Sequence, residues 1–153
     1  MALFGSFDIS ASALTANRLR MDVISSNISN ANTTRGEYVN GQWQPYKRKM
    51  AVVEPKMGAA SFDNFLQSAV SKTGGSSANG VRVTQIIEDK TPPKMVYDPS
   101  HPDANARGYV AMPNVDMLKE MIDLMSTTRA YESNVTAVNA SKAMAMKALE
   151  IGK

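Results

Sequence analysis

Apolar residues recur every seven positions near the start of the chain, and this spacing predicts a helix of about 24 residues. The repeat comprises Phe7, Leu14, Met21 and Ile28, with Ala11, Ile24 and Ala31 beside it. Ser6 or Asp8 would suit the N-cap of this helix. The polar segment 30–36 contains Asn, Thr and Gly, which favour the end of a helix.

A second seven-residue repeat covers the last part of the chain and predicts a coiled-coil helix of about 36 residues. Its two registers are Met117, Leu124, Tyr131, Val138 and Ala145, and Met121, Thr128, Val135 and Leu149. Lys142 interrupts the second register, and Asn114 would suit the N-cap.

Between these helices the pattern changes to short β-branched runs separated by prolines and glycines. The predicted strands are Met50–Glu54, Val81–Asp89, Lys94–Tyr97 and Gly108–Met112. A short helix over Ser61–Lys72 and a flexible loop over Thr73–Gly80 are also expected. The apolar content of this middle is small, so we expect β-hairpins rather than a deep core.

These patterns predict a mainly α protein with a small β part, in which long N- and C-terminal helices pair as a coiled coil. The expected organisation is an N-terminal helix over 1–34 and a β-rich middle over 35–113. A C-terminal helix over 114–153 follows.

Composition narrows the function classes for this chain of 153 residues. It contains no cysteine, which excludes disulfides, cysteine–zinc sites and thiol nucleophiles. No stretch approaches the roughly 18 apolar residues of a membrane span. The first residues lack the basic and apolar regions of a cleaved signal peptide, so export would require another route.

The net charge of +3 arises from one segment, 35–56, where five basic residues face two acidic ones. Within it, Tyr46, Lys47, Arg48 and Lys49 follow Trp43, and interleaved aromatic and basic residues are typical of nucleic-acid binding. The alternative is a solvated strand edge on which lysine and arginine prevent unwanted pairing. We favour the strand edge, because no other part of the chain is basic.

The sequence offers little for catalysis or cofactor binding. His101 is the only histidine, and a metal site would need Asp98 and Asp103 beside it. Prolines on both sides of His101 favour a rigid turn instead. We therefore expect no enzyme, no catalytic residue, no cofactor and no metal. An enzyme centred on His101 stays as the alternative, and loss of an activity in His101→Ala would support it.

The positions of several asparagines and the number of methionines are unusual. Asn27, Asn30, Asn134 and Asn139 lie on or beside the apolar repeats, where they are either solvent-exposed or fix helix register by bonding across helices. Asn27 and Asn139 are the ones expected to face inward. Eleven methionines suit a surface that packs against several non-identical neighbours.

Four separated motifs carry a resemblance to a known family. The stretch from Asp8 to Thr33 and the run Arg129–Val135, followed by Asn139 and Lys142, are similar to the terminal motifs of bacterial flagellar axial proteins. The segments Tyr97–Ala104 and Gly108–Val115 resemble the proximal-rod members of that family, and Pro45–Lys49 also fits.

The resemblance implies a structural subunit of the flagellar basal-body rod, which transmits torque by rigid packing. Its partners would be itself and other rod proteins in a helical assembly, after export by the flagellar type III apparatus, with no nucleic acid bound. The expected subunit-interface residues are Leu14, Met21, Ile24, Asn27, Ile28, Met117, Met121, Leu124, Tyr131, Val135, Val138, Asn139 and Leu149. The expected contacts with neighbouring rod proteins are Tyr46, Lys47, Arg48, Asp98 and His101.

Overall fold

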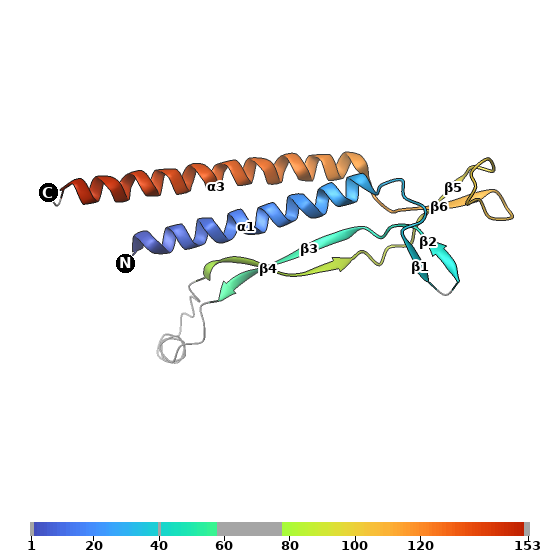
Figure 1. Cartoon of the computed structure of the whole chain (residues 1–153), viewed down its shortest axis with the longest axis horizontal. Helices are drawn as coiled ribbons and strands as arrows, with labels where there is room; N and C mark the ends of the chain where they lie inside the picture. Colours follow the sequence, from blue (N-terminus) through green and yellow to red (C-terminus); the bar gives the residue numbers. More distant parts are fainter. Residues whose placement is uncertain (1, 40, 58–77, 152–153) are drawn as a thin grey trace, which may run out of the picture. The chain divides into compact units, whose positions relative to one another are not determined.

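A computed structural model describes residues 2–39, 41–57 and 78–151, and two long helices dominate it (Figure 1). Helix α1 spans Ala2–Ser29 and helix α3 spans Met117–Ile151. Both predicted terminal helices are therefore confirmed. Helix α1 ends just before the polar segment 30–36, as expected.

The predicted caps of the two helices are wrong. Helix α1 already includes Ser6 and Asp8, so neither residue precedes its first turn. At the start of α3 the cap is Asp116 rather than Asn114. The Asp116 Oδ1 atom accepts hydrogen bonds from the backbone N–H groups of Leu118 at 3.1 Å and Lys119 at 3.3 Å.

Within the described residues, the strands form three two-stranded sheets. Strands β3, Lys49–Met57, and β4, Ala78–Glu88, pair with each other. Strands β5, Lys94–Tyr97, and β6, Tyr109–Met112, form an antiparallel hairpin in which Val96 lies opposite Val110. The four predicted strands are thus confirmed, with ends shifted by a few residues.

A third hairpin was missed by the sequence analysis. Strand β1, Glu37–Val39, pairs antiparallel with β2, Gln42–Gln44, and Tyr38 lies opposite Trp43. Gly41 has a φ of +83° in the connection. The sequence signal was the dipeptide Asn40-Gly41, because Asn-Gly favours the two-residue turns of tight hairpins.

The chain divides into two compact units, each drawing on segments far apart in the sequence. The first comprises Met1–Leu19, Val52–Gln85 and Thr128–Lys153, and the second comprises Arg20–Ala51 and Ile86–Thr127. Part of α1 and part of α3 contribute to each unit.

In the first unit, strand β4 is attached to α1 through Ser12. The Ser12 hydroxyl donates to the carbonyl of Ile9 at 2.7 Å and accepts from the backbone N–H of Val81 at 3.1 Å. Gly80 has a φ of +99°, and a Cβ atom there would collide with the Ser12 side chain. The predicted loop 73–80 is corrected at 78–80, because strand β4, which pairs with β3, already begins at Ala78. The rest of that loop and the predicted helix 61–72 lie outside the described residues.

The apolar core is small, as the sequence indicated. Among the described residues, the fully buried apolar side chains are Ala16, Val23, Ile24, Ala31, Val110 and Val115. All except Ala16 belong to the second unit. With so little apolar burial, polar contacts decide how the segments of the second unit fit together.

The most buried positions of α3 also follow a seven-residue spacing, but they are polar or small. Glu120, Thr127 and Ser141 are buried, and Asn134 between them is half-buried. Thr127 and Asn134 donate to the carbonyls four residues earlier, at 2.7 and 2.8 Å. Leu124, Tyr131 and Val138 flank this line and are half-buried. The predicted period is correct, whereas the most buried line is shifted from the apolar one.

Replacing Gly80 tests the contact between α1 and β4. We expect Gly80→Ala to lower the free energy of unfolding by about 1–3 kcal/mol, since alanine is strained at this φ and collides with Ser12. Urea unfolding followed by circular dichroism would measure the change. The control is Gly5→Ala, where no atom lies near the added Cβ, and there we expect no loss. Equal stability of Gly80→Ala and the parent chain would contradict the described contact.

Candidate assembly interface

A buried asparagine joins three segments of the second unit. Asn27, near the end of α1, is 1% exposed. Its Oδ1 atom accepts from the backbone N–H of Lys49 at 2.9 Å, and its Nδ2 donates to the Lys49 carbonyl at 2.9 Å. The Tyr46 hydroxyl also donates to Oδ1 at 3.0 Å, and Nδ2 donates to Glu120 at 3.1 Å. The side-chain amide therefore pairs with the start of β3 in the manner of a neighbouring strand.

A buried carboxylate completes this arrangement. Glu120 is 1% exposed, and its Oε1 accepts from Nε and Nη2 of Arg48, each at 2.6 Å. The Arg48 Nη1 lies 3.9 Å from Asp89 Oδ2, at the end of β4. Because an unpaired buried charge is strongly destabilising, Glu120 requires both Arg48 and Asn27. We call Asn27, Tyr46, Arg48, Asp89 and Glu120 the polar cluster.

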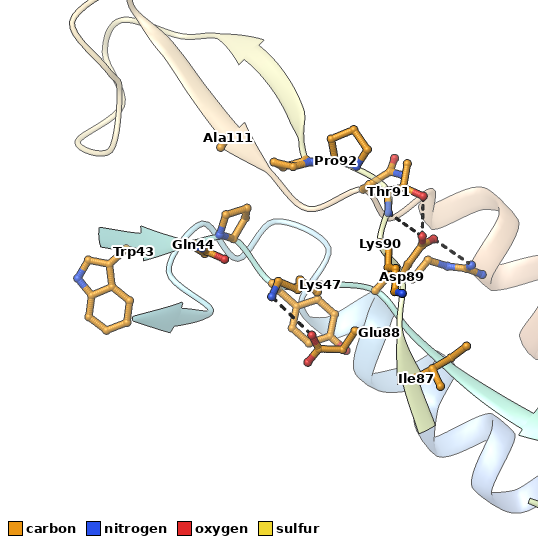
Figure 2. A pocket seen from close by; sticks show the side chains of 15 residues that line it. Trp43, Gln44, Lys47, Ile87, Glu88, Asp89, Lys90, Thr91, Pro92 and Ala111 are labelled. Atoms are coloured by element: carbon orange, nitrogen blue, oxygen red, sulfur yellow. Dashed lines mark hydrogen bonds and ion pairs between the residues drawn. The ribbon is translucent and has the colours of Figure 1, made fainter. Parts of the chain in front are cut away.

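The basic segment 46–49 is mostly neutralised by carboxylates of the second unit. Lys47 lies 3.6 Å from Glu88 and 3.8 Å from Glu37, and Figure 2 shows the pair with Glu88. Arg48 is bound to Glu120, as described. Lys49 lies over the Tyr46 ring at 5.8 Å from its centre. The segment therefore does not present a continuous row of free cations.

Beside this segment lies an open groove of about 900 Å³ (Figure 2). Its apolar walls include Trp43, Tyr46, Ile87 and the prolines 92 and 93. Asp89 on its floor accepts from the Thr91 hydroxyl at 2.5 Å and from the Thr91 N–H at 2.9 Å, which together lower the pKa of Asp89.

His101 lies in a tight turn. Its Nδ1 accepts from the backbone N–H of Asp103 at 3.1 Å. Asp98 accepts from the hydroxyl and N–H of Ser100, and Asp103 accepts from Arg35 and Thr34. The predicted turn is present, and its rigidity stays a prediction. Among the described residues, no group of three His, Asp or Glu side chains is placed to hold a metal ion.

The other predicted interface residues differ in how far the chain itself covers them. Ile24 is buried with Asn27, whereas the half-buried ones are Leu14, Met21, Ile28, Leu124, Tyr131, Val135 and Val138. Met117, Met121, Leu149 and Asn139 are exposed. The expectation that Asn139 faces inward is not met within this chain, because its helix position lies off the buried line.

The first turns of α3 carry an exposed apolar surface in the second unit. Its members are Met117, Leu118, Met121, Ile122 and Met125, which we call the α3 outer face. The buried line of the same helix begins with Glu120. The first turns of α3 are therefore polar on the side that the chain covers and apolar on the exposed side. Neither α1 nor α3 carries a stretch long and apolar enough to cross a membrane.

Sequence reasoning found Asn27 but missed Glu120 as a functional residue. A signal was available, because Glu120, Thr127, Asn134 and Ser141 form a seven-residue repeat of small or polar residues. Such a line beside an apolar repeat indicates a polar seam.

Two family models match the ends of the chain. The model described as flagella basal body rod protein matches residues 7–35, and that described as flagellar basal body rod FlgEFG protein C-terminal matches residues 106–151. These ranges cover most of α1 and all of α3.

Full-length relatives carry one name. The chain is 58% identical over 153 residues to the flagellar basal-body rod protein FlgC of Bacillus subtilis (strain 168), covering 100% of both chains. It is 40% identical to the protein of that name from Borreliella burgdorferi, covering 99% of this chain and 98% of the relative. The one from Escherichia coli O157:H7 is 39% identical, with 100% of both chains covered.

Removing the Asn27 amide tests the polar cluster. We expect Asn27→Ala to lower the free energy of unfolding by about 2–4 kcal/mol, because buried partners on Lys49, Tyr46 and Glu120 lose their hydrogen bonds. Urea unfolding would measure this. Asn139→Ala is the matched control: the residue is exposed, and its removal should change stability by at most about 0.5 kcal/mol. Equal effects of the two substitutions would contradict the role assigned to Asn27.

Acid should loosen the turn around His101. Hydrogen bonds from Arg35 and then Thr34 lower the pKa of Asp103 from its ordinary 3.8. Their stabilising effect is therefore complete above about pH 4 and is lost as the pH falls through the lowered pKa. Chemical shifts of Thr34 and Ala104 should move in that acid range. In Asp103→Asn these chemical shifts should differ from those of the parent chain already at pH 7 and should not change further in acid. Shifts in the parent chain that stay unchanged at all pH values would refute the assigned role of Asp103.

Proposed function

Because this chain belongs to the FlgC family of flagellar basal-body rod proteins, it is a structural subunit of the rod, and we propose that it assembles through the outer faces of its two terminal helices. The observation that carries the proposal is the distribution of side chains on α3. Polar side chains lie on its buried line, while the large apolar ones of its first turns lie outside.

An exposed apolar face of this kind is stabilised when another subunit covers it. The α3 outer face contains methionine at three of its five positions, and methionine adapts its shape to different neighbours. This suits a rod in which one surface meets non-identical proteins. Head-to-tail contacts of this type repeat along a helical assembly.

The first unit offers a second apolar surface between its helices. An open hollow of about 510 Å³ is lined by Phe7, Ala11 and Leu14 of α1 and by Val138 of α3. Residues of both helices thus remain accessible to a neighbour. This supports placing Leu14 and Val138 in subunit contacts.

The middle of the chain would supply contacts with other rod proteins. Lys47 is exposed at the groove edge, and the turn of Asp98 and His101 is held rigid by its own hydrogen bonds. Tyr46 and Arg48 would act indirectly, since they hold the polar cluster together. In this role the subunit performs no chemistry and reaches the periplasmic rod through the flagellar type III export apparatus.

The alternative of nucleic-acid binding through residues 43–49 has less support. Lys47 and Arg48 are both paired with carboxylates, so they would have to exchange these for phosphates. A steep salt dependence of binding to single-stranded DNA would be its signature. We propose that the rod is the functional context of this segment.

Substituting Met121 separates assembly from folding. Met121 is exposed, so Met121→Asp should change the free energy of unfolding of the isolated subunit by less than about 1 kcal/mol. In the rod it would bury an unpaired carboxylate at a cost of about 3–5 kcal/mol per contact. We therefore expect Met121→Asp to abolish rod completion and swimming when it replaces the parent protein in a complementation assay.

Two controls frame this experiment. Met121→Leu keeps an apolar side chain of similar volume and should swim. His101→Ala removes one hydrogen bond of a turn and should leave some motility. If Met121→Asp swims normally, the α3 outer face is not an assembly surface and the proposal fails.

A further inference from the structure

Three methionines form a ridge along the α3 outer face. Met117, Met121 and Met125 are spaced four residues apart, so their side chains follow one another on the same side of the helix. They are 41%, 47% and 58% exposed. We call these three residues the methionine ridge.

Accessible thioether sulfur is open to oxidation, whereas covered sulfur is protected. Met21, Met50 and Met112 are only partly exposed and serve as internal references. Met95, Met144 and Met146 are as exposed as the ridge but lie elsewhere, on β5 and near the end of α3. The chain thus contains ridge methionines, exposed methionines outside the ridge and partly covered ones.

We propose that the methionine ridge is a redox modification site, at which a hydroperoxide oxidises the unassembled subunit and thereby keeps it out of the rod. The inference rests on the proposed function, because it takes the α3 outer face as an assembly surface. The cysteine-free sequence leaves methionine as the sulfur that such an oxidant can reach.

The reaction is a two-electron oxygen transfer. A sulfur lone pair attacks one peroxide oxygen, an S–O bond forms and the O–O bond breaks. The proton of the attacked oxygen passes to the second oxygen, which leaves as water when the oxidant is hydrogen peroxide and as an alcohol when it is an organic hydroperoxide. Sulfur is thereby oxidised to the sulfoxide and the peroxide is reduced. Methionine sulfoxide reductases reverse the change, which makes it a switch rather than permanent damage.

The sulfoxide changes what the ridge can pack against. It places a strong hydrogen-bond acceptor on a side chain that had been apolar. Burial of that acceptor against an apolar neighbour leaves it without a donor and is unfavourable. Subunits already in the rod have the ridge covered, so the modification selects against unassembled copies.

Peroxide treatment of the purified full chain tests accessibility. After a pulse of hydrogen peroxide, peptide mass spectrometry should find sulfoxide formed about 5-fold faster at Met117, Met121 and Met125 than at Met21, Met50 and Met112. In basal bodies treated in the same way, the ridge should be protected by a similar factor. Equal rates at ridge and partly covered positions, or an unprotected ridge in basal bodies, would overturn the proposal.

A matched pair of variants tests the consequence for assembly. The ridge variant carries Met117→Leu, Met121→Leu and Met125→Leu, and the control variant carries Met95→Leu, Met144→Leu and Met146→Leu. A sublethal peroxide pulse is given while cells rebuild sheared flagella and rods. The new rods of each strain are expressed as a fraction of those that it builds without peroxide, because the ridge substitutions change the assembly surface itself. This fraction should fall several-fold in the parent and in the control variant and should stay unchanged in the ridge variant. Equal loss in both variants would refute the ridge as the site.

The proposed function and this inference fail in different ways. If Met121→Asp assembles normally, the assembly surface itself is refuted. If Met121→Asp blocks the rod but the ridge variant gains no peroxide resistance, the surface stands and the modification site is refuted. Met121→Gln, which adds a polar group without oxidation, should reduce rod formation several-fold, and unimpaired assembly of that variant would also count against the switch.

Discussion

The buried carboxylate of Glu120 is the constraint on which the second unit depends. A carboxylate at 1% exposure needs charged or hydrogen-bonding partners, and this chain supplies them from Arg48 and Asn27. Asn27 in turn is occupied by both backbone groups of Lys49. The end of α1, the start of β3 and the first turns of α3 must therefore be in register together. A small apolar core could not impose this geometry, because apolar packing is non-directional.

Because polar side chains form the buried line of α3, the large apolar side chains of its first turns are left on the exposed side of the helix. Were the seam built from methionine and leucine, the α3 outer face would have less to offer a neighbour. The specific polar contacts lie within the chain, where each group always meets the same partner. The adaptable methionine side chains of the first turns of α3 lie on its exposed side. This division matches the demands on a rod subunit, which must keep its own form while it meets several proteins.

The period of each helix was predictable from the sequence, whereas the phase of the buried line was not. Apolar residues at seven-residue spacing identify a helix and a seam, but the repeat of Met117 and Leu124 does not reveal that Glu120 is the buried position. That burial depends on Arg48, far away in sequence, and long-range pairing leaves no local pattern. Asn27 could be singled out because asparagine is costly inside a helix and needs a reason. The hairpin at Tyr38 and Trp43 was identifiable from Asn40-Gly41, a local signal that was overlooked.

The predicted interface residues differ in how far they are exposed, and the difference has a physical reason. Residues such as Ile24 and Asn27 are buried within the chain, while Met117, Met121 and Leu149 are exposed. The predicted interface residues thus separate into those that the chain itself covers and those that it leaves exposed. The separation follows from a physical cost: polar groups such as Glu120 are buried only where their partners are built in, whereas methionine tolerates water before assembly and an apolar neighbour after it.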